Sequence, residues 1–302
     1  MTLLAEDAWR PLAAAHAARV DALASEHLDR RRRGLKHPVE DFLWTYYSHT
    51  PGQLRRWHPG PGTTLAGADE HAGWRYYATA AEGVRLDLDA YLAQRGGTVG
   101  FVRDLLARTS ERAGQWSCFG LHEWAMVYRT TPDQVRHVGW PLRLGHAGTD
   151  AVVEAHQLRC THFDAYRFFT PDAAPRNALT PTRERQVTLE QPGCLHATMD
   201  LYKWSYKLAP GIPTDLVMDA LALARAARDL DMRAAPYDLA PLGLAPIPIE
   251  TPDGKAAYVA EQRRIAEAGT ALRGRLVAAC DALLAQPRGA ATGGGSANSS
   301  HT

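Results

Sequence analysis

Apolar residues recur at helical spacing over most of this chain, and strand-like patterning is confined to its middle. Apolar positions three or four residues apart predict amphipathic helices, whereas a period of two predicts strands. The helical pattern begins with a long alanine-rich segment from about residue 5 to about residue 33. Further helices are expected at residues 39–47, 86–93, 99–112, 116–129, 195–208, 214–231 and 253–284.

The pattern changes after Pro132. Residues 142–144 and the run 152–169, which contains neither proline nor glycine, predict strands. The connection 171–192 is long enough that a functional role is expected for it. The expected fold class is therefore α+β: a mainly helical single domain, residues 1–286, with a small antiparallel sheet in the middle of the chain. A glycine- and serine-rich end, residues 287–302, predicts a flexible tail.

Composition narrows the class of protein. With 302 residues, of which 45% are hydrophobic, the chain can bury a full core, and its net charge of +1 lacks the basic character of a DNA-coating protein. Four scattered cysteines without a C-x-x-C pair argue against a disulfide framework and a thiolate zinc site. We find no cleavable leader and no apolar run of membrane-spanning length, so a cytoplasmic protein without membrane contact is expected.

The segment 194–207 carries the clearest candidate site. Read as a helix, it places four polar residues on one face, because they are spaced by four, three and four positions. The rest of the segment is almost entirely apolar or aromatic, which is typical of a buried helix. On a buried helix these side chains need a metal, a counter-charge, a substrate or water, whereas on an ordinary amphipathic helix they face solvent. The four residues are His196, Asp200, Lys203 and Lys207.

Histidines and carboxylates recur in other predicted elements. In a strand over 152–169, His162 and Asp164 lie on one face about 7 Å apart, which suits a shared ligand; the alternative is a surface strand with charged cross-strand pairs. Two other His and Glu pairs lie in predicted helices, one of them at a helix start, where capping chemistry is the alternative. This donor set suits a divalent transition metal, although H-E-x-x-H is absent. The candidate ligands are His37, Glu40, His122, Glu123, His162, Asp164, His196 and Asp200.

Aromatic residues near the same segments permit a different chemistry. A base taken out of a duplex is held by stacking on aromatic rings while a carboxylate activates water, although aromatic residues more often belong to a core. Two basic stretches, residues 29–36 and 53–58, suit either phosphate contacts or solvated helix ends. The phosphate loop, the dinucleotide fingerprint and the G-x-S-x-G elbow are all absent.

Four segments carry a resemblance to a known family: HPVEDFLWTYYSH at 37–49, THFDAYRFF at 161–169, EQPGCLHATMDLYK at 190–203 and LDMRAAPYD at 230–238. They resemble a group of actinobacterial proteins identified as 3-methyladenine DNA glycosylases, from about residue 8 to about residue 285. The resemblance implies a DNA-repair enzyme that hydrolyses the N-glycosidic bond of alkylated bases without a cofactor.

The chain departs from the two established folds with that activity. It has no Gly-rich hairpin followed by a catalytic Asp, as in the helix-hairpin-helix glycosylases. It does contain Val-Glu, Pro-Arg-Asn and Pro-Gly in the order found in the other alkyladenine glycosylase fold. Alignment with that fold would give Glu154 the role of activating water.

Three hypotheses follow. The leading one is a glycosylase that binds DNA, with two carboxylates, two histidines as proton or orientation partners, and a lysine for charge. The alternative is a metal-dependent oxygenase or hydrolase that acts on a small molecule through a divalent transition metal. The third is a non-catalytic binding protein, in which the polar stripe, the four polar residues on one face of segment 194–207, faces solvent or forms salt bridges. The catalytic candidates are Asp164, Asp200, His162, His196 and Lys203.

Overall fold

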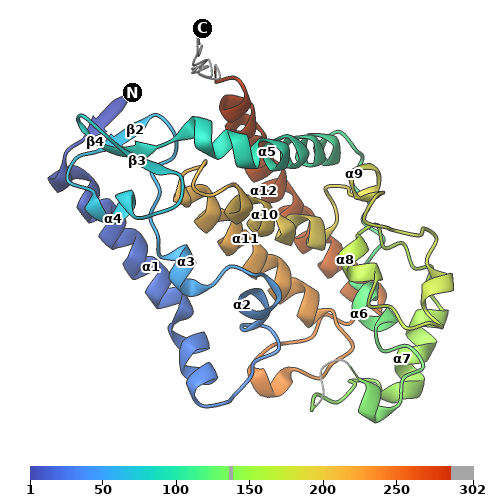
Figure 1. The fold of residues 1–302 in the computed structure, drawn as a ribbon. Helices are drawn as coiled ribbons and strands as arrows, with labels where there is room; N and C mark the ends of the chain where they lie inside the picture. The colour runs from blue at the N-terminus through green and yellow to red at the C-terminus, as the bar shows by residue number, and fades with distance from the viewer. Residues whose placement is uncertain (136–138, 287–302) are drawn as a thin grey trace, which may run out of the picture.

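The computed structural model describes residues 1–135 and 139–286 as a mainly helical assembly with one small sheet (Figure 1). The mainly helical α+β class is confirmed. The predicted flexible tail, residues 287–302, lies outside the described residues. None of the helices in the described ranges is long and apolar enough to cross a lipid bilayer.

Long helices at the centre and C-terminal end build the main core. Helix α10 (Leu195–Leu208) packs against α11 (Thr214–Arg233), and both contact α12 (Pro252–Leu284), which also packs along α5 (Leu88–Ser110). Figure 1 shows α10, α11 and α12 running next to one another through the molecule. The core surrounds α10, which buries residues on nearly every side, as its apolar composition predicts.

The N-terminal part forms a smaller unit around the sheet. Helix α1 (Glu6–Arg32) runs along one side, and its Trp9 joins Trp57, Leu65 and Val84 in a separate apolar cluster. The sheet has the order β1-β2-β4-β3; β1 and β2 pair in parallel and the other pairs are antiparallel. Its strands are β1 (Thr2–Leu4), β2 (Thr63–Leu65), β3 (Tyr77–Ala80) and β4 (Gly83–Leu86).

The position of the sheet and the predicted strands after residue 140 differ from the sequence expectation. The sheet is mixed and lies in the first 86 residues rather than in the middle of the chain. The run 152–169 instead contains the end of α7 (Gly145–Glu154) and the short α8 (Phe163–Tyr166). The β-branched residues Val152 and Val153 favour a strand by intrinsic preference, but they belong to α7 and pack into the core. Tertiary packing overrides the intrinsic strand preference here. Residues 142–144 form only an isolated bridge, from Leu142 to Tyr237.

Several predicted helices have different limits. The expected helices at 86–93 and 99–112 are one helix, α5, because Gly96 and Gly97 continue it instead of ending it. The expected helix 116–129 shortens to α6 (Leu121–Ala125), after Phe119 and Gly120 with positive φ. Short elements complete the fold: α2 (Phe42–Tyr46), α3 (Pro51–Leu54), α4 (Asp69–Ala72), α9 (Gln186–Leu189) and the 3-10 turns Pro132–Gln134, Ala174–Arg176 and Ala240–Leu242.

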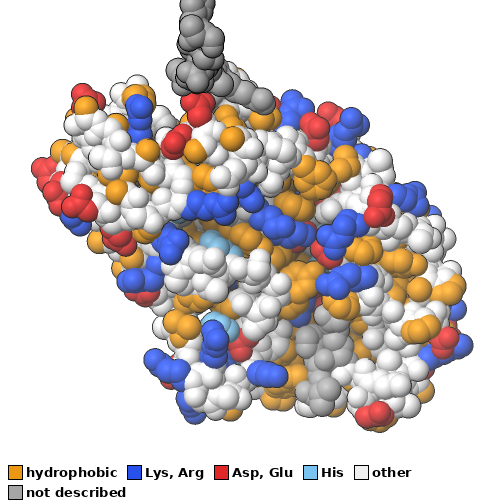
Figure 2. Space-filling model, viewed as in Figure 1, with side chains coloured by type: hydrophobic (Ala, Val, Ile, Leu, Met, Phe, Trp, Pro, Cys, Tyr) orange, Lys and Arg blue, Asp and Glu red, His pale blue; other side chains and the backbone are white. Residues whose placement is uncertain are grey.

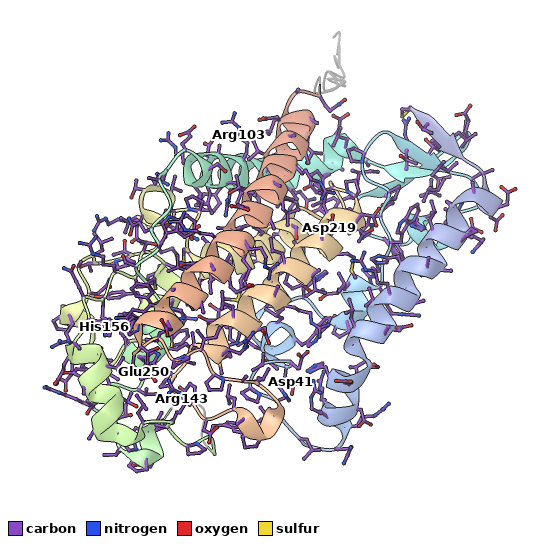
Figure 3. The ribbon with its side chains drawn as sticks, turned by 180° about the vertical axis from the view of Figure 1, so that it is seen from behind. Asp41, Arg103, Arg143, His156, Asp219 and Glu250 are labelled. Carbon is purple, nitrogen blue, oxygen red and sulfur yellow. The ribbon has the colours of Figure 1, made fainter. Side chains whose placement is uncertain are left out.

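A bidentate ion pair ties the segment before α7 to the start of α12. Arg143 donates to both oxygens of Glu250, at 2.6 and 2.8 Å, and Figure 3 shows the two labelled side chains close together. Both side chains are largely buried. A paired guanidinium–carboxylate contact of this kind fixes geometry as well as adding stability.

Candidate metal centre

Two groups of three ligand-type side chains converge beside α10. In each group, one ligand atom from every residue lies within 4.8 Å of the others. The residues come from α6, α10, α11 and two loops, so the tertiary fold and not a local motif brings them together. Cluster 1 is His162, Glu190 and Asp200, and cluster 2 is His122, His196 and Asp231.

Cluster 1 is fully buried. His162 Nε2 lies 3.4 Å from Asp200 Oδ2 and 3.5 Å from Glu190 Oε1, and the three residues are 1–3% exposed. Asp200 projects from α10, and its other oxygen accepts a 2.9 Å hydrogen bond from the Tyr47 hydroxyl. Neither ring nitrogen of His162 has a hydrogen-bond partner among the described residues.

Local contacts hold the two loop residues of cluster 1. Glu190 directly follows α9, and Arg112, just after α5, donates to the carbonyl oxygens of Val187 and Glu190. Gln186 donates to the Glu190 carboxylate at 2.6 Å. His162 precedes α8 as its N-cap residue. Both ligands are therefore positioned by short elements in the segment between α7 and α10.

Cluster 2 joins three helices. His122 of α6 and Asp231 of α11 approach to 2.9 Å between Nε2 and Oδ1, and both atoms lack a hydrogen bond in acceptable geometry. His196 of α10 packs edge-on against His122, with ring centroids 4.4 Å apart. The Asp231 side chain is completely buried. Such a carboxylate is costly unless a cation or a hydrogen-bond donor faces it.

The spacing of these atoms fits a coordination shell. Ligand atoms about 2.0–2.2 Å from a transition metal lie about 2.9–3.6 Å from one another in octahedral or tetrahedral geometry. The His122 to Asp231 contact and the two His162 contacts fall within this range, at 2.9, 3.4 and 3.5 Å. They also lack the geometry of hydrogen bonds. Such spacings suit a metal ion in cluster 1. In cluster 2 the charged His122 ring faces Asp231 as an ion pair, so a metal would have to displace its proton.

The protonation states favour ligation by two of the three histidines. The third, His122, is held in its charged form because, although burial opposes the charge, the Asp231 carboxylate raises its pKa well above the ordinary value. Burial lowers the pKa of both His162 and His196 to about 3, so both rings are neutral and carry a lone pair at neutral pH. Burial, together with the charge of Asp200, raises the pKa of Glu190 to about 8. Glu190 thus needs a further positive charge to ionise at neutral pH, and a divalent cation between the three side chains would supply it.

Two buried cations partly neutralise the clusters. Lys203 Nζ lies 2.7 Å from Asp200 and 3.1 Å from Asp164, and although burial opposes its charge, these carboxylates raise the pKa of Lys203. Arg228 contacts Glu123 at 2.9 Å and Asp231 at 3.3 Å. Both cations therefore have structural partners.

The two clusters are neighbours. The ring of His196, in cluster 2, lies 5.4 Å from that of His162, in cluster 1. A small hollow of about 20 Å³, which is room for one water molecule, is bordered by His196, Asp164 and Glu123. The arrangement offers three histidines and three carboxylates around adjacent positions.

The structure does not bring every predicted ligand to this centre. His37 accepts hydrogen bonds from the backbone of its own turn, and Glu40 pairs with Arg225 of α11 at 2.7 Å. Glu123 and Asp164 border the hollow but pair with Arg228 and Lys203. Asp164 does not share a strand face with His162, because the two residues open a helix.

Glu154, the water-activating residue implied by alignment with the other alkyladenine glycosylase fold, lies elsewhere. It ends α7 near the surface, where Tyr128 and Arg129 contact it.

Two cluster residues were missed by sequence reasoning. Asp231 lies three residues after Arg228 on a buried helix face, the same signal that singled out α10. Glu190 follows an irregular segment, where periodicity gives no information. Three cysteines that are far apart in the sequence also lie together near the site. Cys118, Cys160 and Cys194 line one hollow beside cluster 2, and Cys118 Sγ is 3.9 Å from His122 Nδ1.

Comparison with known proteins adds no assignment. No protein-family model, no curated protein and no solved structure matches this chain. The chemistry of the two clusters therefore carries the functional argument.

Proposed function

We propose that this protein is a metal-dependent enzyme that acts on a small molecule, with cluster 1 and cluster 2 as its metal ligands. The observation that supports this most is the pair of contacts that His162 makes with Asp200 and Glu190, at 3.4 and 3.5 Å, with no hydrogen-bond partner on either ring nitrogen of His162 among the described residues. The three carboxylates of the two clusters are costly in the interior unless cations compensate them.

The donor set favours oxygenase chemistry over hydrolysis. Cluster 2 supplies two histidines and one carboxylate, the combination used by non-haem iron oxygenases. Cluster 1 supplies one histidine and two carboxylates, which suit a second divalent ion. A bound metal would supply Lewis acidity and, if redox-active, electron transfer to oxygen. Arg228 contributes to the lowered pKa of Asp231, and Lys203 donates to Asp200.

Cobalt titration tests this proposal. Co²⁺ reports nitrogen and oxygen ligation through its visible absorption, so addition to chelator-treated protein should give a saturable spectrum with one or two equivalents. Asp231→Asn and Asp200→Asn should each remove one component, whereas Glu154→Gln, at a surface carboxylate, should leave the spectrum unchanged. No ligand-field spectrum at stoichiometric cobalt would contradict the proposal.

A second candidate function is the DNA glycosylase implied by the sequence resemblance, and one specific observation favours it. Lys207 is within electrostatic reach of Lys203, Arg95 and Arg183, and Arg95 donates to its carbonyl oxygen. Figure 2 shows a row of Lys and Arg side chains over α10 on this face. Such a row beside Asp164 and Asp200 could follow a phosphate backbone.

This candidate has its own test. Release of methylated purine from alkylated DNA should occur without added metal and disappear in Asp164→Asn and Asp200→Asn. Lys207→Met should weaken DNA binding and reduce its salt dependence. Failure to release a base from alkylated DNA by well-folded protein would exclude it.

A further inference from the structure

A large cavity lies at the end of α1, outside the metal centre. Its volume is about 780 Å³, within the range of small-molecule pockets. The turn after α1 and helix α2 line it, and Trp140 lines it as well. A cavity of this size accommodates a ligand of one or two rings with a polar substituent.

The cavity is positively charged. Arg31 and Lys36 line it, and neither forms an ion pair within the described part of the chain. Asp41, the carboxylate in the lining, is already neutralised: Arg30 contacts it at 2.8 Å and His27 at 2.9 Å. Figure 2 shows Lys and Arg side chains gathered where Figure 1 places the end of α1, and Figure 3 labels Asp41 beside that end. The cavity therefore has two cations without counter-ions.

Aromatic side chains supply its apolar walls. Phe42, Trp44 and Trp140 all line the cavity, and each is partly exposed. Trp44 stacks on His27 with ring centroids 5.8 Å apart, so one face is supported from within the protein. Exposed faces of supported aromatic rings bind planar groups by stacking. Cations beside such faces add selectivity for a negatively charged substituent.

Phe42 connects this cavity to the metal centre. It lines the large cavity and also the small hollow that His196 and Asp164 border. Its ring stacks on Tyr46, with centroids 4.9 Å apart, and the Arg228 guanidinium lies 4.0 Å from its centroid. One aromatic side chain thus forms a common wall between a ligand-sized cavity and the ligands of cluster 2.

We propose that the cavity binds a planar aromatic anion, a carboxylate or a phosphate ester, and that this anion is the substrate presented to the metal centre. Stacking on Trp44 and Trp140 would hold the ring, and Arg31 and Lys36 would hold the oxyanion. The role as substrate rests on the proposed metal-dependent function; binding of the anion does not.

Titration calorimetry with matched probes tests the proposal on the full chain. Indole-3-carboxylate and adenosine 5′-monophosphate represent the carboxylate and phosphate sources, and indole-3-carboxamide and adenosine are their neutral counterparts. We expect at least one anion to bind at least tenfold more tightly than its neutral counterpart. An Arg31→Met, Lys36→Met double variant should lose this preference.

The matched control is an Arg32→Met, Arg33→Met double variant. Both arginines lie at the same helix end, outside the cavity lining, and pair with Asp29. This control should bind the probes like the unaltered protein. Equal affinity for charged and neutral probes, or equal loss in both double variants, would overturn the proposal.

Metal content separates this proposal from the proposed function. Each titration is repeated with chelator-treated protein, in which probe binding should persist. Probe binding without any metal binding would overturn the metal-dependent function alone. Metal binding without selective probe binding would overturn the anion pocket alone.

Discussion

His162 and Asp200 face each other across 3.4 Å in the protein interior, and no hydrogen bond joins them. Burial keeps the imidazole neutral, and the Asp200 carboxylate already accepts from Tyr47 and Lys203. A neutral ring nitrogen and a carboxylate oxygen at this separation can share a metal ion without rearrangement of the backbone. This contact is the basis of our functional account.

Arg228 is expected to contribute strongly to the stability of the fold. Its side chain is 2% exposed and contacts Glu123 and Asp231, so Arg228→Met leaves buried carboxylates uncompensated, at a cost of about 3–5 kcal/mol. Arg225→Met, on the same helix, removes only a half-exposed pair with Glu40 and should cost at most about 1 kcal/mol. Urea denaturation of both variants measures the difference. Equal losses would show that the buried pair has no special role.

The protein should lose stability in acid through histidines that lie away from the clusters. Burial lowers the pKa of His58 to about 3 and that of His49 to about 4, from an ordinary value of 6.5. As the pH falls below 6.5, the unfolded chain takes up protons that the folded protein does not, so stability decreases down to about pH 3. His58 alone contributes on the order of 2–4 kcal/mol to this loss.

Melting curves between pH 7 and pH 4 check this prediction. His58→Asn should flatten the dependence of the melting temperature on pH, whereas His146→Asn, on α7, should not. An unchanged slope in His58→Asn would show that this ring does not resist protonation in the folded protein.

Metal removal should destabilise the fold. A ligand present at about 100 times its dissociation constant stabilises a protein by about 2.7 kcal/mol, which for this chain length corresponds to roughly 4–5 °C. Calorimetric melting before and after chelator treatment should show this decrease, and restored metal should reverse it. The decrease should be absent in an Asp200→Asn, Asp231→Asn double variant. An identical melting temperature with and without chelator would argue against tight binding at either cluster.

We expect the native Lys203 side chain to lower the affinity of cluster 1 for a metal ion. Its ammonium group lies 2.7 Å from Asp200 Oδ2 and therefore competes with a metal for that oxygen. Lys203→Met should raise the affinity for a divalent ion, by about tenfold, in competition with a chromophoric chelator. Lys255→Met, on α12, serves as the control. Weaker metal binding in Lys203→Met would mean that the lysine positions Asp200 instead of competing for it.

Much of the helical body could be predicted from periodicity, because α10, α11 and α12 bury long, largely apolar faces and α1 is rich in alanine. The polar stripe of α10 was also evident, since its four charged or polar residues interrupt an otherwise apolar segment. Asp200 is 2% exposed, so the stripe does not face solvent at that position.

The region between α7 and α10 could not be predicted in the same way. Residues 155–162 lack regular structure. They are held by individual side-chain hydrogen bonds, such as the two that join the Asn177 amide to the backbone of Cys160. Short helices of four residues leave no periodic signal. The pairing of His122 with Asp231 joins residues far apart in sequence, and neither a spacing motif nor local propensity encodes it.

The central claim is tested most directly by elemental analysis of untagged protein purified without chelators, compared with an Asp200→Asn, Asp231→Asn double variant. We predict one to two equivalents of a transition metal, such as iron, per chain in the unaltered protein and less than a tenth of that in the folded double variant. A well-folded protein without transition metal that also fails to take it up from stoichiometric solution would contradict the account.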